Sequence, residues 1–173
     1  MAVGLGPLPT LHPVPGFELG IASAGIKRPG RKDVVVMRCA EGSRVAAVTT
    51  TNAFCAAPVI VTRERFRGDV RYLLTNTGNA NAGTGADGLR NARRACAALA
   101  ALTGVEETAV LPFSTGVIGE PLPVEKIEGA LQAALDDLSV DHWAEAATGI
   151  MTTDTLPKGA SRQFEHDGVT VTV

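Results

Sequence analysis

The stretch 108–120, TAVLPFSTGVIGE, constrains the fold more than any other part of the chain. Its apolar start, 109–111, predicts a short strand closed by Pro112, and the Ser-Thr-Gly triplet that follows predicts a turn. Gly116 lets the backbone approach a ligand because it has no Cβ, and Thr115 adds a hydroxyl beside backbone N–H donors. Such donors can receive a developing oxyanion. An ordinary strand-to-helix turn explains the same residues, since such turns are common in α/β folds.

Composition excludes several classes of protein. With 173 residues, 45% of them hydrophobic, the chain fits one domain or a large piece of a bigger one. The net charge of −2 comes without a basic cluster interleaved with aromatic residues, so a nucleic-acid interface is not expected. The longest apolar run, 95–102, is far shorter than the roughly 18 residues of a membrane-spanning helix. The N-terminus is proline-rich where a secretory signal would be apolar, so we expect a cytoplasmic protein without a membrane role.

Cysteine and histidine are too scattered for a metal centre or a disulfide framework. No CxxC, HExxH or HxxxH pair occurs, and the number of cysteines is odd. We therefore expect buried free thiols, no metal and no cofactor. The residues concerned are Cys39, Cys55, Cys96, His12, His142 and His166.

The first half of the chain predicts short strands after a proline-rich arm. Residues 1–16 are expected to be extended, and 17–173 to form one domain. The β-branched runs 33–39 and 44–51 flank a turn signal and predict a hairpin. A third apolar run begins at Pro58 and leads into a charged surface segment, and 70–76 predicts a further strand.

The second half predicts three helices and a hairpin. One helix is expected from Asp87 to Leu102 with Gly104 as its stop. A second begins at Pro123 and carries an apolar stripe. The third begins near Asp141, with Trp143, Ala147 and Ile150 facing inward. The last hairpin joins 163–165 to 169–173, and a strand at the chain end without a polar tail predicts a fragment.

The loop 77–88 is rich in glycine and asparagine and offers an alternative function. Gly83, Gly85 and Gly88 precede a helix and match the spacing of a dinucleotide-binding fingerprint. That fingerprint needs its tight turn directly after the strand, whereas several residues intervene here. A dinucleotide-binding module therefore stays the weaker alternative.

The segment 152–158, TTDTLPK, is a second polar loop. It places three hydroxyls and a carboxylate after a predicted helix, where capping alone would not select them. This loop is therefore a candidate binding site.

Five segments together resemble the α chain of the ornithine acetyltransferase family, the glutamate N-acetyltransferases of cyclic arginine biosynthesis. They occur in the family's order, from about Pro15 to the end of the chain. The segments are AGIKRPGRKD, TNAFCAAPV, NTGNANAGTG, STGVIGEPLP and MTTDTLPK. The resemblance implies an α/β fold, with sheets layered with helices, that resembles the N-terminal-nucleophile enzymes.

The resemblance also implies roles for particular residues. Thr115 and Gly116 match the family's oxyanion-hole pair, and Thr152 matches its α-chain substrate contact, with Thr153 as the neighbouring possibility. The nucleophile is the N-terminal threonine of a β chain cut from the same precursor, and the family suggests two αβ pairs. This sequence lacks that threonine and the substrate-binding lysine, so half of the site is expected elsewhere.

The implied reaction moves acetyl from N2-acetyl-L-ornithine to L-glutamate through an acetyl-threonine intermediate. Some family members also accept acetyl-CoA as donor. A related acetyltransferase of clavulanic acid biosynthesis shares several of the motifs, which leaves the amino-acid specificity open. A subunit that only scaffolds a catalytic partner is a further alternative.

Overall fold

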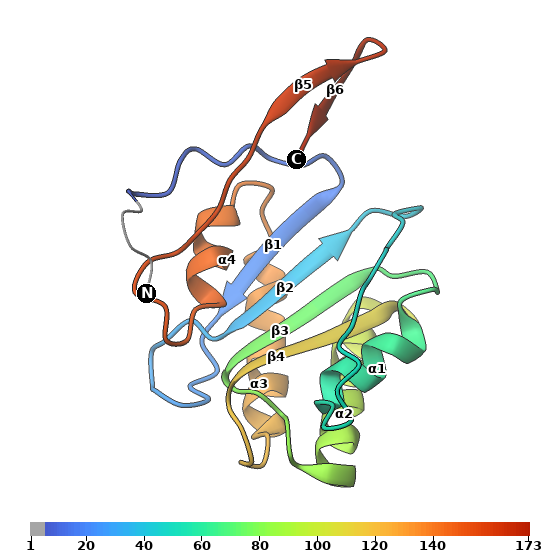
Figure 1. Cartoon of the computed structure of the whole chain (residues 1–173), viewed down its shortest axis with the longest axis vertical. Coiled ribbons are helices and arrows are strands. Elements are labelled where there is room, and N and C mark those ends of the chain that lie inside the picture. Colours follow the sequence, from blue (N-terminus) through green and yellow to red (C-terminus); the bar gives the residue numbers. More distant parts are fainter. Residues whose placement is uncertain (1–5) are drawn as a thin grey trace.

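The computed structural model describes residues 6–173 and shows a four-stranded mixed sheet with helices on both faces (Figure 1). Residues 6–16 form no helix or strand. The first five residues of the arm predicted over 1–16 lie outside the described part, and its extended form stays a prediction. The elements are β1 (Phe17–Ala22), β2 (Val34–Cys39), α1 (Ala57–Arg65), β3 (Tyr72–Asn79), α2 (Gly85–Thr103), η1 (Glu107–Ala109), β4 (Val110–Val117), α3 (Val124–Asp136), α4 (Trp143–Gly149), β5 (Gln163–His166) and β6 (Val169–Thr172).

The strand order is β1-β2-β3-β4. Strands β1 and β2 are antiparallel, as are β2 and β3, whereas β3 and β4 are parallel. Helix α2 makes the crossover that a parallel pair requires. Because of these directions, the ends of β1, β3 and β4 and the start of β2 meet at one edge of the sheet, which we call the site edge.

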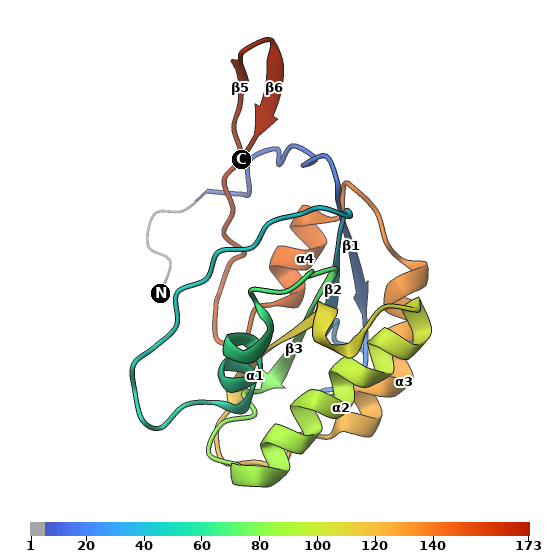
Figure 2. The same ribbon diagram turned by 90° about the vertical axis from the view of Figure 1, so that its right-hand side faces the viewer.

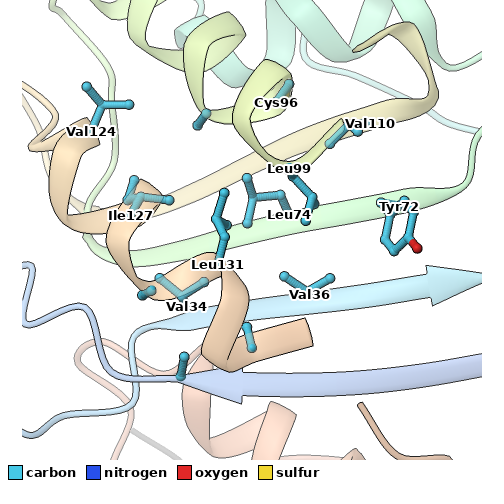
Figure 3. Packing of buried hydrophobic residues seen from close by; sticks show 14 of the residues in the cluster. Val34, Val36, Tyr72, Leu74, Cys96, Leu99, Val110, Val124, Ile127 and Leu131 are labelled. Atoms are coloured by element: carbon cyan, nitrogen blue, oxygen red, sulfur yellow. The ribbon is translucent and has the colours of Figure 1, made fainter. Parts of the chain in front are cut away.

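Helices α2 and α3 cover one face of the sheet, and α1 packs on α2 beside β4 (Figure 2). The main core lies between this face and the two long helices (Figure 3). Leu74 of β3, Leu99 of α2 and Leu131 of α3 meet there, and the two helix leucines have no exposed surface. In both helices, the apolar residues whose spacing predicted the helix lie on the face that packs on the sheet. No helix within residues 6–173 is long and apolar enough to cross a membrane.

Three predictions for the first half of the chain are wrong in whole or in part. Residues 44–51 form no strand, because β1 and β3 occupy both edges of β2 and leave it no free edge to pair. The run from Pro58 is not a strand but the first turn of α1, where proline is well tolerated. The charged segment is also not fully solvated, since Arg65 is only 8% exposed and bonds the carbonyls of Glu107 and Val110.

The second face of the sheet is only partly covered by helix. Helix α4 packs on β1 and β2, and loops close over the rest. Trp143 packs there as predicted, but the buried alanine is Ala146, and Ile150 remains 48% exposed. Two apolar cavities of about 370 and 510 Å³ lie over this face and share Leu73 and Phe113 in their walls.

The predicted C-terminal hairpin is confirmed as β5 paired with β6. It projects away from the main sheet (Figure 1). Its residues are largely exposed, including Phe164 at 48% and Val169 at 64%.

Candidate functional site

The Ser-Thr-Gly triplet lies inside a strand, which corrects the expected turn. Strand β4 continues through Pro112 and holds Ser114, Thr115 and Gly116 in parallel pairing with β3. Pro112 is tolerated because β4 is an edge strand, where the missing N–H can face away from its neighbour. The triplet is therefore held by a sheet and lies at the site edge.

Gly116 pairs with Gly78 across the two strands, next to a bulge at Gly78 and Asn79. Its φ of +134° lies in a region that side chains rarely adopt, and Gly78 has a φ of +93°. A Cβ on Gly116 would meet the Asn79 nitrogen at 2.6 Å. Backbone contact at this distance explains the glycine, and it brings the end of β4 tight against the loop after β3.

Buried asparagines hold this junction together, and sequence reasoning missed them. Asn76 accepts a hydrogen bond from the Ser114 Oγ at 2.6 Å and donates to the Asn79 carbonyl at 2.9 Å. The Asn79 amide donates to the carbonyls of Glu120 and Pro121, both at 3.1 Å. The only sequence signal was the recurrence of asparagine in NTGNAN, because the partners are distant in sequence.

Asn81 organises the rest of the loop before α2. It has a φ of +47°, is fully buried, and donates to the Gly88 carbonyl at 2.9 Å. Its Oδ1 accepts the Thr84 hydroxyl at 3.0 Å. A Cβ on Gly88 would meet both of these side-chain oxygens, so this glycine serves the packing of the asparagine.

The glycines of the dinucleotide alternative do not form a phosphate-binding turn. Strand β3 ends at Asn79, before Gly83, and α2 already begins at Gly85, so Gly88 lies within the helix. Two of the three strand pairs of the main sheet are antiparallel, unlike the parallel sheet of dinucleotide-binding folds. The structure does not support this alternative.

Thr152 lies in the loop after α4, and the structure brings this loop to the site edge. The Thr77 hydroxyl, opposite Thr115 in the β3–β4 pairing, donates to the Gly149 carbonyl at 3.2 Å. The Arg31 guanidinium donates to the carbonyl of Met151. Thr152 itself is half-buried. The predicted oxyanion pair and the predicted substrate contact thus belong to two segments that Thr77 links.

The loop between β1 and β2 completes this edge. Asp33 is 1% exposed and accepts the N–H groups of Ala24 and Ile26 at 2.7 and 2.6 Å. Lys27 from this loop pairs with Glu120 at 2.9 Å. The basic loop, the β3–β4 junction and the segment after α4 therefore converge.

The ionisable groups differ strongly in their surroundings. Burial raises the pKa of the Cys96 thiol to about 12, and burial also raises that of Cys39. Both are buried as predicted, whereas Cys55 is half-buried, and all three are free. A hydrogen bond from Lys158 lowers the pKa of Asp154 near Thr152. Within residues 6–173 no cluster of three or more His, Cys, Asp or Glu could hold a metal ion.

Comparison with known proteins identifies the family. The ArgJ family model matches residues 18–173. The arginine biosynthesis bifunctional proteins ArgJ of Pseudomonas syringae pv. tomato and Pseudomonas fluorescens are 84% and 80% identical over 173 residues. Each alignment covers 100% of this chain and 43% of the relative, so the chain spans less than half of these relatives' length.

Solved structures agree with the family model. The arginine biosynthesis bifunctional protein ArgJ of Bacillus halodurans is 36% identical with a TM-score of 0.83, over 92% of this chain and 84% of that one. The ornithine acetyltransferase of Mycobacterium tuberculosis, complexed with ornithine, is 30% identical with a TM-score of 0.80, over 94% and 88%. The resemblance and the expected fold of sheets layered with helices are confirmed. The chain belongs to the ArgJ family, whose model covers it from residue 18 to residue 173.

Proposed function

We propose that this chain is the α chain of a cytoplasmic acetyltransferase that moves acetyl from N2-acetyl-L-ornithine to L-glutamate. The remaining part of the protein, a β chain released by autocatalytic cleavage of one precursor, supplies the nucleophilic threonine. The α chain contributes the oxyanion hole and part of the substrate site. Two such αβ pairs form the complete enzyme.

In the first step, the threonine Oγ attacks the acetyl carbonyl carbon of N2-acetylornithine while the threonine's own α-amine takes its proton. The negative charge that develops on the carbonyl oxygen is received by Thr115 and Gly116. The C–N bond then breaks, and the departing amine of ornithine takes the proton. The acetyl group remains on the threonine as an ester.

In the second step, the amine of glutamate attacks the ester carbon, and the oxyanion that forms is received by the same pair of donors. The threonine α-amine passes the proton that the glutamate amine loses to the threonine Oγ as the C–O bond breaks, so the threonine hydroxyl is restored and N-acetylglutamate leaves. Since both steps pass through a tetrahedral oxyanion at one place, a single fixed pair of donors serves the whole cycle.

The observation that carries this proposal is the Gly78–Gly116 contact in a chain of the ArgJ family. Gly116 has a backbone conformation that residues with a side chain rarely adopt, and it lies on a paired strand beside Thr115. An oxyanion hole needs donors fixed before the reaction, because reorientation during the reaction would cost much of the stabilisation. A loop turn would meet that need less well than a sheet edge.

Thr152 is proposed to contact the bound amino acid. Its loop is tied to the site edge through Thr77 and Arg31. The related M. tuberculosis ornithine acetyltransferase was solved with ornithine, which supports an ornithine-type substrate for this fold. Two alternatives concern the substrate. Acetyl-CoA could replace N-acetylornithine as acetyl donor, and the chain could have the amino-acid specificity of the related acetyltransferase of clavulanic acid biosynthesis.

The proposal is tested with the full-length protein and with residues 1–173 alone. We expect the full-length protein to transfer acetyl from N-acetylornithine to glutamate and to separate into two chains by mass. We expect residues 1–173 alone to be inactive. We also expect them to aggregate through the exposed apolar side chains of the hairpin and the apolar cavities over the partly covered sheet face. Acetyl transfer by a well-behaved monomer of residues 1–173 would overturn the division of the site between chains. Parallel assays with acetyl-CoA and other amino acids decide the substrate.

A further inference from the structure

Asn76 is a buried amide that ties together two strands at the site edge. It lies on β3 and is 4% exposed. Its Oδ1 accepts the Ser114 hydroxyl of β4 at 2.6 Å, and its Nδ2 donates to the carbonyl of Asn79 at 2.9 Å. One side chain therefore connects the residue before Thr115 to the bulge residue after Gly78.

These two hydrogen bonds bracket the Gly78–Gly116 contact. Ser114 precedes it on β4, and Asn79 follows it on β3, where the pairing shifts at the bulge. A buried amide with an unsatisfied donor or acceptor is costly, so both groups of Asn76 favour the one backbone arrangement in which both partners are in reach. The backbone arrangement that the Asn76 hydrogen bonds favour fixes the positions of Thr115 and Gly116 on β4.

The Asn79 side chain extends the tie to the segment after the oxyanion pair. It donates to the carbonyls of Glu120 and Pro121 and accepts the N–H of Asn81 at 2.8 Å. The backbone from 114 to 121 is thus held near both ends by asparagines of the β3 segment. Thr115 and Gly116 lie between these two attachments.

We propose that Asn76 is a positioning residue for the oxyanion pair, acting through Ser114 and Asn79 and not through contact with the substrate. This inference rests on the proposed function of Thr115 and Gly116. The physical reason is that donors to a transition state must be held within about 0.5 Å of the productive geometry. A misplacement of about 1 Å can lower the rate about 100-fold.

A role in folding alone predicts a different result from positioning. Loss of a buried hydrogen bond lowers the melting temperature wherever it lies. Displacement of the Thr115 and Gly116 donors lowers kcat and leaves KM nearly unchanged, because the oxyanion forms only in the transition state. Thr62→Val is the matched control, since Thr62 is 6% exposed and its hydroxyl donates to Pro112, also on β4, at 3.2 Å.

The test compares variants of the complete, processed two-chain enzyme, with cleavage verified by mass. We expect Asn76→Ala to lower kcat about 10- to 100-fold and Ser114→Ala about 3- to 10-fold, with KM within about threefold. Thr62→Val should lower the melting temperature without changing kcat. In Thr115→Ala protein, Asn76→Ala should reduce kcat less than it does in the wild type, because Asn76 acts by positioning Thr115 and the Thr115 hydroxyl is already absent.

Asn76→Asp adds a readout that a folding role would not move. The ionised carboxylate cannot donate to the Asn79 carbonyl, whereas the protonated acid can. Burial raises the pKa of such a carboxyl, so we expect the kcat of this variant relative to wild type to rise at least about tenfold from about pH 8.5 to about pH 6. Asn76→Ala should show no such recovery.

The inference is overturned if Asn76→Ala and Ser114→Ala lower the melting temperature like Thr62→Val yet keep kcat within about twofold of wild type. If Asn76→Ala does not assemble, Ser114→Ala and the pH profile of Asn76→Asp decide. Wild-type kcat in Thr115→Ala protein would instead remove the oxyanion pair itself. If Thr115→Ala loses kcat while the Asn76 variants keep that of wild type, only the positioning role of Asn76 would be overturned.

Discussion

Gly116 lies opposite Gly78 across the parallel pair β3–β4, so close that a Cβ on Gly116 would lie 2.4 Å from the Gly78 carbonyl carbon. This contact joins two segments that α2 separates in the sequence. It also places the STG triplet of β4 against the asparagine-rich loop after β3. The stability of the fold and the geometry of the proposed site therefore depend on the same pair.

Gly116→Ala should destabilise the enzyme and abolish measurable acetyl transfer. A side chain at φ +134° is strained by about 1–3 kcal/mol, and the backbone contact adds to this, so we expect a melting temperature at least about 5 °C lower. Gly168→Ala is the control, because Gly168 has a φ of +77° but open space around it. Equal melting temperatures for the two variants, measured by calorimetry, would show that the Gly78–Gly116 contact is not tight.

Thr115→Ala should lower kcat about 10²–10³-fold, or about 3–4 kcal/mol, as the loss of one oxyanion donor typically does. KM should change far less. Thr115→Ser keeps the hydroxyl and should retain most of the activity. Steady-state kinetics of the complete enzyme measure both variants, and wild-type turnover by Thr115→Ala would exclude Thr115 from the oxyanion hole.

Thr152→Val should raise KM for N-acetylornithine about tenfold and lower kcat much less, because it removes a contact made in both ground and transition states. Thr153→Val, the adjacent and more exposed threonine, is the matched control. If Thr153→Val raises KM while Thr152→Val does not, the contact belongs to Thr153. A structure with bound substrate would show which hydroxyl faces it.

Arg31→Met should also raise KM, since its guanidinium donates to the Met151 carbonyl beside Thr152. A hydrogen bond from a charged donor contributes about 1.5–3 kcal/mol net, and Arg31 acts on the substrate contact only through the loop at Met151, so we expect a smaller effect on KM of about five- to tenfold. Arg28→Met removes the same charge from an exposed position in the same loop. A similar KM for both variants would mean that net charge, not the link to Met151, matters.

Cys96 should make the fold less stable at high pH. Its pKa is about 12 in the folded protein against 9.0 for an ordinary cysteine, so above pH 9 the unfolded chain releases a proton that the folded chain keeps. Stability from this group is complete below pH 9 and is lost as the pH rises toward 12. The melting temperature of Cys96→Ala should therefore fall less steeply over this range than that of wild type. Parallel slopes would contradict the buried, protonated thiol.

Local patterns in the sequence predicted the elements whose structure is decided by their own residues. The run that forms β2 predicted a strand through its β-branched composition, and it is buried on both faces. The apolar stripe of α3 predicted a helix through its period, because burial of one helix face imposes that spacing. Gly104 ends α2 in the left-handed conformation that was expected of it. The hydroxyl loop near Thr152 and the STG triplet stand out in the sequence as unusual residue types in short segments, but the turn predicted for the triplet is a strand.

Only the tertiary structure decided which of these segments meet. The run 44–51 has the composition of a strand, but the edges of β2 were already taken by β1 and β3. The link from Asn76 to Ser114 spans 38 residues, and that from Thr77 to Gly149 spans 72. Local composition carries no information about contacts at such separations, because they depend on strand order and on the crossover through α2. The sequence by itself therefore determined the candidate residues, and the parallel pairing of β3 and β4 decided how they are held.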